Sequence, residues 1–131
     1  LPISDLTCSD NKITWLNLSR VPALKDLFCK NNQLRKLDLS CVPVLASLNC
    51  SGNRLRELDL TGVPALTELN CRGNQLAVLD LSSVPALTTL DCRSNRISKL
   101  DISCCPSIKK AYCDKGVLVQ KLPQQVIDSR P

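Results

Sequence analysis

Cysteine and aspartate are the residues of this 131-residue chain whose numbers and spacing are most suggestive of chemistry. The chain has nine cysteines and no histidine. The Ser-His and Cys-His arrangements of nucleophilic catalysis are therefore excluded, and no glycine-rich loop that would cradle a phosphate occurs. Zinc is disfavoured as well, because histidine and C-x-x-C pairs are both lacking. We predict that the chain is not an enzyme and uses neither a cofactor nor a metal.

These residues recur because a unit of 21 residues is repeated along the chain. Its pattern is L-x-C-x-x-N-x-L-x-x-L-D-L-S-x-V-P-A-L, and complete units open at Leu6, Leu27, Leu48, Leu69 and Leu90. A fixed period of roughly 20 to 29 residues with Leu, Asn and Cys at set positions is typical of leucine-rich repeats, in which each coil adds one short strand to a parallel sheet. We predict a β-rich leucine-rich-repeat solenoid with a parallel sheet, about six coils and weak curvature.

The repeat also predicts how the chain is divided. Residues 1–131 form one leucine-rich-repeat domain, with coils over about residues 3–118 and a divergent C-terminal coil or cap over residues 119–131. In this alignment Leu118 continues the inward row of Ile97, 21 residues earlier. Because the chain lacks methionine and begins within a unit, we expect it to be processed or trimmed. It has no apolar run long enough to span a bilayer, so we predict no transmembrane segment.

Most of the cysteines form a row in the repeat. Neighbouring Cβ atoms of parallel strands in register lie about 4.8 Å apart, beyond the roughly 3.5 to 4.5 Å of a disulfide. We therefore predict free, buried thiols in this row. Outside it, only the adjacent Cys104 and Cys105 could bond to each other. The row comprises Cys8, Cys29, Cys50, Cys71, Cys92 and Cys113.

Two further rows are polar. The asparagine row, which includes Asn32 and Asn53, is predicted to satisfy backbone groups of the turn that follows the first strand. The aspartate row, which includes Asp38 and Asp59, requires hydrogen bonds from local backbone, from hydroxyls such as that of Ser40, or from nearby bases. Calcium is the alternative for this row, although each unit offers only one carboxylate where a calcium loop gathers several oxygens.

The cysteine row and the segment C-x-x-N-x-L-x-x-L-D-L-S resemble the cysteine-ladder subclass of bacterial leucine-rich repeats, which includes internalin-type proteins of Listeria and predicted surface proteins of gut Bacteroidetes. The likeness covers Ile3 to about Leu118. It implies an adhesin-like module of a surface or secreted bacterial protein.

Binding residues are expected where outward positions differ from coil to coil. On the first-sheet face, Phe28 and Tyr112 are exposed aromatic residues, and such residues are natural interface anchors. Trp15 lies on the second wall. The alternative is that Trp15 shields the first coil and Tyr112 packs against the C-terminal cap. The other candidates on the first-sheet face are Asp26, Lys30, Asn49, Glu68, Asn70, Arg72, Asp91 and Arg93.

A basic flank is the secondary candidate surface. It contains seven bases against Glu57, with Arg35, Lys36, Arg54 and Arg56 at its centre. Such a surface either forms solvated salt bridges with the neighbouring aspartate row or contacts acidic glycans, anionic lipid or phosphate. Because it lacks stacking aromatic residues apart from Trp15, we predict no nucleic-acid binding.

The predicted function is a non-enzymatic module that binds a protein or glycoprotein on its first sheet, at a bacterial cell surface or after secretion. One alternative is a structural spacer that associates end to end through its first coil. Another is an intracellular effector-type scaffold in the cytoplasm, where free thiols persist.

Overall fold

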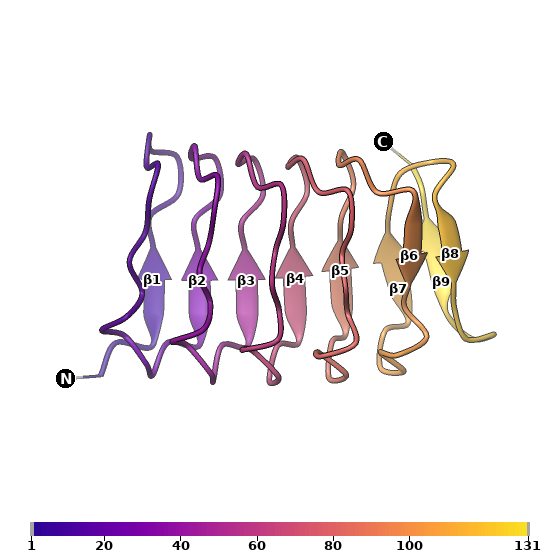
Figure 1. Cartoon of the computed structure of the whole chain (residues 1–131). Coiled ribbons are helices and arrows are strands. Elements are labelled where there is room, and N and C mark those ends of the chain that lie inside the picture. The colour runs from indigo at the N-terminus through magenta and orange to yellow at the C-terminus, as the bar shows by residue number, and fades with distance from the viewer. Residues whose placement is uncertain (1, 131) are drawn as a thin grey trace.

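The computed structural model describes residues 2–130 as a solenoid of stacked coils (Figure 1). Leu1 and Pro131, the ends of the predicted domain, lie outside the described residues. The larger sheet is parallel, with strand order β1-β2-β3-β4-β5-β7-β9, and β6 and β8 pair separately. Its strands stand side by side in a row in Figure 1, and the chain forms about six stacked coils, as predicted. The strands are β1 Asp5–Thr7, β2 Asp26–Phe28, β3 Ser47–Asn49, β4 Glu68–Asn70, β5 Thr89–Asp91, β6 Lys99–Asp101, β7 Lys110–Tyr112, β8 Leu118–Gln120 and β9 Val126–Asp128.

The larger sheet, here called the first sheet, keeps the 21-residue register of the sequence. Leu27 of β2 pairs with Leu48 of β3, and the next strand adds Leu69. These leucines are buried, while the residues on either side of each face outward. A strand turns successive side chains to opposite faces, so three residues suffice to place one core residue between two surface residues.

The opposite wall, here called the second wall, is mostly extended chain rather than sheet. The segment Leu37-Asp38-Leu39 alternates between buried and exposed as expected, but a strand ladder forms only between β6 and β8. Between the earlier coils, backbone hydrogen bonds lie ahead of this wall, at the turn that follows each asparagine of the row, as from Arg54 N to Leu34 O at 2.8 Å. The predicted second strand is therefore a near-strand in most coils.

The return loop of each unit is built from the Val-Pro-Ala-Leu sequence. In the third coil, Leu66 N donates to Val63 O at 3.1 Å, which closes a turn with Pro64 at its second position. Proline suits that position because its ring fixes φ near the value the turn requires. Both Val63 and Leu66 are fully buried, so the turn also supplies two core residues.

The cysteine row forms a ladder of free thiols inside the coils. Cys29, Cys50 and Cys71 are fully buried, whereas Cys8, in the first coil of the array, is only half-buried. Burial therefore holds as predicted except at that end. Cys104 and Cys105 are also free thiols in this structure.

The asparagine row is hydrogen-bonded from coil to coil. Asn53 Nδ2 donates to Cys29 O of the preceding coil and to Cys50 O of its own coil, both at 3.0 Å, and its Oδ1 accepts from Leu34 N at 3.0 Å. Asn11, in the first coil, bonds only to carbonyls of its own coil, Cys8 O at 2.9 Å and Ser9 O at 3.0 Å. The predicted structural role of the row is confirmed.

The residue before each asparagine of this row has a positive φ, which the repeat pattern alone does not display. Asn31, Gly52, Gly73 and Ser94 have φ values of 56°, 66°, 70° and 58°. This left-handed conformation favours Gly and Asn. At Gly52 a Cβ would also lie 2.3 Å from Asn31 Oδ1, so any other residue there would have to displace the Asn31 side chain.

The last coil is shorter than 21 residues between its strands, and this corrects the assignment of Leu118. Leu118 pairs with Lys99 rather than following Ile97, and its side chain is 68% exposed. Val119 takes the inward position opposite Leu100. The chain then returns to the first sheet, where β9 pairs with β7.

Two side chains hydrogen-bond to backbone groups at the C-terminal end of the array. The carboxylate of Asp114 accepts from Ser94 N at 2.8 Å and from Asn95 N at 3.2 Å. The buried amide of Gln125 donates to Ile102 O and Cys105 O, at 3.0 and 2.8 Å. These bonds satisfy backbone groups of the last regular coil.

Candidate functional site

The candidate site is a shallow groove across the first sheet, from β2 to β7, with a volume of about 260 Å³. We call it the first-sheet groove. In-register pairing places the third residues of the strands in one column along its floor. That column is Phe28, Asn49, Asn70, Asp91 and Tyr112, five of the predicted site residues. The remaining lining residues are Ser47, Leu48, Glu68, Leu69, Thr89 and Leu90.

The two aromatic residues lie at the ends of the groove and differ in environment. Phe28 is 37% exposed, and no cation of residues 2–130 lies over its ring. Tyr112 is half-buried, with the guanidinium of Arg93 4.9 Å and the ammonium of Lys110 5.3 Å from its ring centre. Cations over an aromatic ring are attracted to it. Tyr112 is thus held in place by its neighbours, and Phe28 is the freer anchor.

In the two asparagines of the groove floor, the side-chain oxygen accepts hydrogen bonds and the amide nitrogen has no partner within residues 2–130. Asn49 Oδ1 accepts from Ser51 N at 3.1 Å and from Ser51 Oγ at 2.7 Å, and Asn70 Oδ1 accepts from Arg72 N at 3.1 Å. Within residues 2–130 neither Nδ2 group has a hydrogen-bond partner. The floor therefore offers two amide donors, which suit carbonyl or hydroxyl oxygens of a ligand.

One side of the groove is acidic. Asp26 lies beside Asp5 on the adjacent strand, and the pKa of its carboxyl is raised, mainly by a hydrogen bond with Asp5 and then by partial desolvation. Glu68 continues this column two strands further on and accepts from Ser47 Oγ at 3.2 Å. No base lies within 4.0 Å of these three carboxylates in the described part of the chain. A basic group of a ligand would relieve their repulsion.

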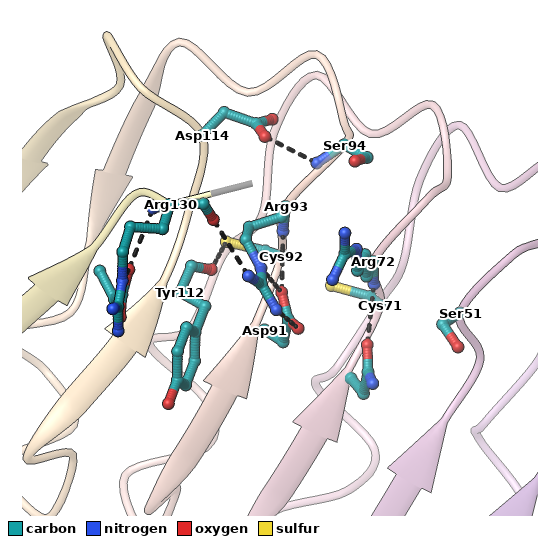
Figure 2. Close-up of polar contacts among 12 residues, drawn as sticks. Ser51, Cys71, Arg72, Asp91, Cys92, Arg93, Ser94, Tyr112, Asp114 and Arg130 are labelled. Atoms are coloured by element: carbon teal, nitrogen blue, oxygen red, sulfur yellow. Dashed lines mark hydrogen bonds and ion pairs between the residues drawn. The ribbon is translucent and has the colours of Figure 1, made fainter.

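The other side of the groove is basic, and Figure 2 shows Arg93, the member with side-chain hydrogen bonds. Arg93 Nη2 lies 2.7 Å from Asp91 Oδ2, and its Nη1 donates to Arg130 O at 3.0 Å (Figure 2). Lys30 and Arg72 occupy equivalent positions in other coils and form no ion pair with residues 2–130. Two of the three predicted bases therefore remain open to a ligand, while Arg93 is committed to Asp91.

The β9 strand adds a charge cluster that the repeat pattern did not indicate. Asp128 is buried and pairs with Arg130 at 2.7 Å and with Lys110 at 3.3 Å. Hydrogen bonds from Arg130 hold the pKa of the Asp128 carboxyl well below its usual range. The repeat does not predict this cluster, because residues 126–130 do not align with the 21-residue unit.

The basic flank contains a second hollow of about 360 Å³, here called the basic groove. It is lined by the four predicted bases together with Glu57 and Gln75. In residues 2–130 none of these bases lies within 4.0 Å of a carboxylate. The expected salt bridges to the aspartate row are therefore not formed. The bases are Arg35, Lys36, Arg54 and Arg56.

The carboxylates of the aspartate row accept hydrogen bonds from hydroxyl residues two positions further along the chain instead. Asp38 accepts from Ser40 N and Oγ, at 2.9 and 2.6 Å, and Asp59 accepts from Thr61 in the same way. These bonds lower the pKa of both carboxyls, so the carboxylates stay ionised. Residues 2–130 contain no group of three or more His, Cys, Asp or Glu side chains that could hold a metal ion.

The ladder thiols are chemically quiet. Burial raises the pKa of Cys29 and of Cys92 to about 12, and that of Cys71 well above its ordinary value. A thiol is reactive chiefly as its thiolate, so these groups are poor nucleophiles at neutral pH. Cys41, which lies in the return loop outside this ladder, is exposed.

Sequence reasoning missed one apolar surface, on the second wall near the C-terminal end. Val78 and Leu118 are 71% and 68% exposed and line a hollow with Leu79, Leu100 and Val119. Val78 could have been found from its position, because the same place in other coils holds Trp15 and charged residues. The exposure of Leu118 could not have been predicted, because its strand pairs at a spacing of 19 residues instead of 21.

Comparison with known proteins gives the same architecture. Residues 64–104 match the family model described as Leucine Rich repeats (2 copies). No curated protein sequence matches significantly. The described part of the chain contains no helix that is long and apolar enough to cross a membrane.

Three solved structures illustrate the likeness. The functional domain of InlJ from Listeria monocytogenes, which includes a cysteine ladder, is 29% identical with a TM-score of 0.87, over 98% of this chain and 30% of that one. A leucine-rich repeat protein of Leptospira interrogans is 19% identical with a TM-score of 0.87, over 98% and 37%. An internalin of Listeria monocytogenes, InlF, is 17% identical with a TM-score of 0.76, over 92% and 39%. This chain therefore spans well under half the length of each.

Proposed function

Because the chain is a leucine-rich repeat protein with a cysteine ladder, we propose that it is a non-enzymatic module of a bacterial surface or secreted protein that binds a protein or glycoprotein in its first-sheet groove. Leucine-rich repeats are generally interaction scaffolds. A fold does not specify a ligand, so the location of the site has to rest on its residues.

The observation that carries the proposal is the composition of the groove floor. It combines an exposed aromatic end at Phe28 with two free amide donors, at Asn49 and Asn70. Acids lie along one side and bases along the other. Binding hot spots are enriched in aromatic residues, and flanking charges set orientation and association rate more than affinity. A folded protein with an apolar protrusion and mixed surrounding charge matches this arrangement.

The surface or secreted setting rests on the likeness to the cysteine-ladder domain of Listeria InlJ. The cytoplasmic alternative is favoured by one observation, the nine free thiols, since reduced cysteines persist in the cytosol. A signal segment encoded upstream in the gene would support export, and its absence from the complete gene would favour the cytoplasm.

The binding experiment begins with a pull-down from host surface extract and continues with purified ligand. Phe28→Ala should weaken binding by about 1 to 4 kcal/mol, which is about 5- to 1000-fold in Kd. Arg72→Glu should mainly slow association and change its salt dependence. Val78→Ala is the matched control, because Val78 is exposed on the second wall. Unchanged binding by both groove variants, or an equal loss with Val78→Ala, would contradict the first-sheet site.

A further inference from the structure

A second row of side chains, separate from the first-sheet groove, alternates between cations and amides. Each member directly follows an asparagine of the asparagine row, and we call this set the turn row. Its members are Lys12, Gln33, Arg54, Gln75 and Arg96. The three cationic members are exposed, and the two glutamines are partly exposed.

The backbone gives the turn row a constant spacing. Each later member donates its N–H to a carbonyl of the preceding coil: Gln33 to Ile13 at 2.9 Å, Arg54 to Leu34 at 2.8 Å, and the same bond recurs at the two following coils at 2.8 Å. Neighbouring coils are about 4.8 Å apart, so the cations recur about every 9.6 Å with an amide between them.

The side chains of the turn row form no ion pairs or side-chain hydrogen bonds with residues 2–130. In residues 2–130 no carboxylate lies within 4.0 Å of Lys12, Arg54 or Arg96. The side chains of Gln33 and Gln75 have no hydrogen-bond partner in that part of the chain. Within residues 2–130, the carboxylates of the aspartate row accept hydrogen bonds from neighbouring hydroxyls and form no ion pair with these cations.

The middle of the turn row opens into the basic groove. Arg54 and Gln75 line this hollow of about 360 Å³ together with Arg35, Lys36 and Arg56, and Glu57 is its one acid. Guanidinium groups bind carboxylate, sulfate and phosphate oxygens through paired N–H donors. Amide side chains both donate to and accept from hydroxyl groups. The row therefore offers anion sites and hydroxyl sites in strict alternation.

We infer that the turn row binds a linear acidic polysaccharide in which acidic and neutral sugars alternate. One sugar ring of an extended chain is comparable in length to one coil spacing, so every second ring would meet a cation and the rings between would meet a glutamine amide. Double-stranded DNA fits less well, because each of its strands carries one phosphate about every 3.4 Å of helix axis. The row also lacks the aromatic residues on which single-stranded bases stack.

The experiment measures binding of fluorescent oligosaccharides by polarisation, with the complete chain and three matched probes. Hyaluronan has one carboxylate in every second sugar, chondroitin sulfate adds a sulfate ester, and dextran is neutral. A DNA duplex of similar length controls for charge alone. Binding of either acidic probe without binding of dextran is expected, and the tighter of the two identifies the anion. Failure of both acidic probes to bind would overturn the inference.

A pair of substitutions distinguishes alternation from general positive charge. The double variant Arg54→Gln/Gln75→Arg keeps the net charge but breaks the alternation, and it should weaken binding about tenfold or more. Arg54→Gln/Arg96→Gln should weaken binding at least as much. Arg20→Gln/Lys109→Gln removes the same charge from exposed positions outside the row and should change binding less than twofold. Thermal unfolding confirms that each variant is folded.

Equal binding by the first double variant and the unsubstituted chain would overturn the inference, as would DNA binding as tight as hyaluronan binding. Each result would mean that charge alone attracts the probe. The proposed protein ligand is tested separately, because Phe28→Ala lies on another face and should leave oligosaccharide binding unchanged.

Discussion

Replacing Asn53 with alanine should destabilise the chain by an amount that can be worked out bond by bond. Asn53 is 7% exposed, and its Oδ1 accepts the N–H of Leu34 at 3.0 Å. Alanine would leave that buried N–H without a partner, at a cost of about 1 to 3 kcal/mol. The carbonyls of Cys29 and Cys50 would each lose one donor but keep another, from Asn32 and Asn74 respectively.

The total follows from adding these terms. Each lost carbonyl bond costs about 0.5 to 1.5 kcal/mol, so the expected loss is about 2 to 6 kcal/mol. A domain is typically stable by about 5 to 15 kcal/mol, so the change should be plain in urea denaturation. The slope of the transition should be checked, because repeat arrays can unfold in more than one step.

Asn11→Ala is the internal control for this prediction. Asn11 belongs to the same row but is exposed and bonds only to Cys8 O and Ser9 O of its own coil. Its replacement should cost less than about 1 kcal/mol, close to one exposed hydrogen bond. Equal losses at Asn11 and Asn53 would refute the idea that contacts between coils give the row its stabilising effect.

Three further predictions concern the core, the thiols and the aspartate row. Leu58→Ala should lower the free energy of unfolding by about 2 to 5 kcal/mol in urea denaturation, because Leu58 is only 7% exposed. Val78→Ala, at a 71% exposed position, should change it little. Similar losses of stability in the two variants would contradict our assignment of inward and outward positions on the second wall. All nine thiols should react in denaturant without reductant, but Cys41 should react first in the native chain because it is exposed; fewer than nine would reveal a disulfide. Bonds from Thr61 lower the pKa of Asp59, so their stabilising effect is present above the unfolded pKa of about 3.9 and is lost as pH falls through the lower folded value. Thr61→Val should raise the Asp59 pKa in an NMR titration, and an unchanged pKa would exclude the hydroxyl as its cause.

The repeat pattern was sufficient to predict the first sheet, because one coil determines the next. Once Leu27 is placed inward, Leu48 and Leu69 follow at the same spacing. The asparagine row could be predicted as well, since a turn with buried backbone groups requires a side chain to satisfy them. The acidic and basic sides of the groove follow from the same register, although which of their charges are already paired does not.

The remaining features depend on contacts that break the repeat. The pairing of Arg93 with Asp91 and the contact of Arg93 with Tyr112 each occur at one place in the array, so periodicity does not predict them. The exposed position of Leu118 follows from a shortened last coil, and its length is set by how the chain returns to pair β9 with β7. Periodic reasoning fails where the period changes.

The asparagine row gives the array a direction. From Asn32 onward, each amide of the row bonds to the backbone of the coil before it, as Asn53 does to Leu34, and never to that of the coil after it. During synthesis, which proceeds from the amino end, every coil would leave the ribosome with an N–H that only its successor can pair. Removing a coil from the amino end would leave a surplus amide like that of Asn11, whereas removing one from the carboxyl end would orphan a buried donor. The two ends of the array should therefore differ in their tolerance of shortening.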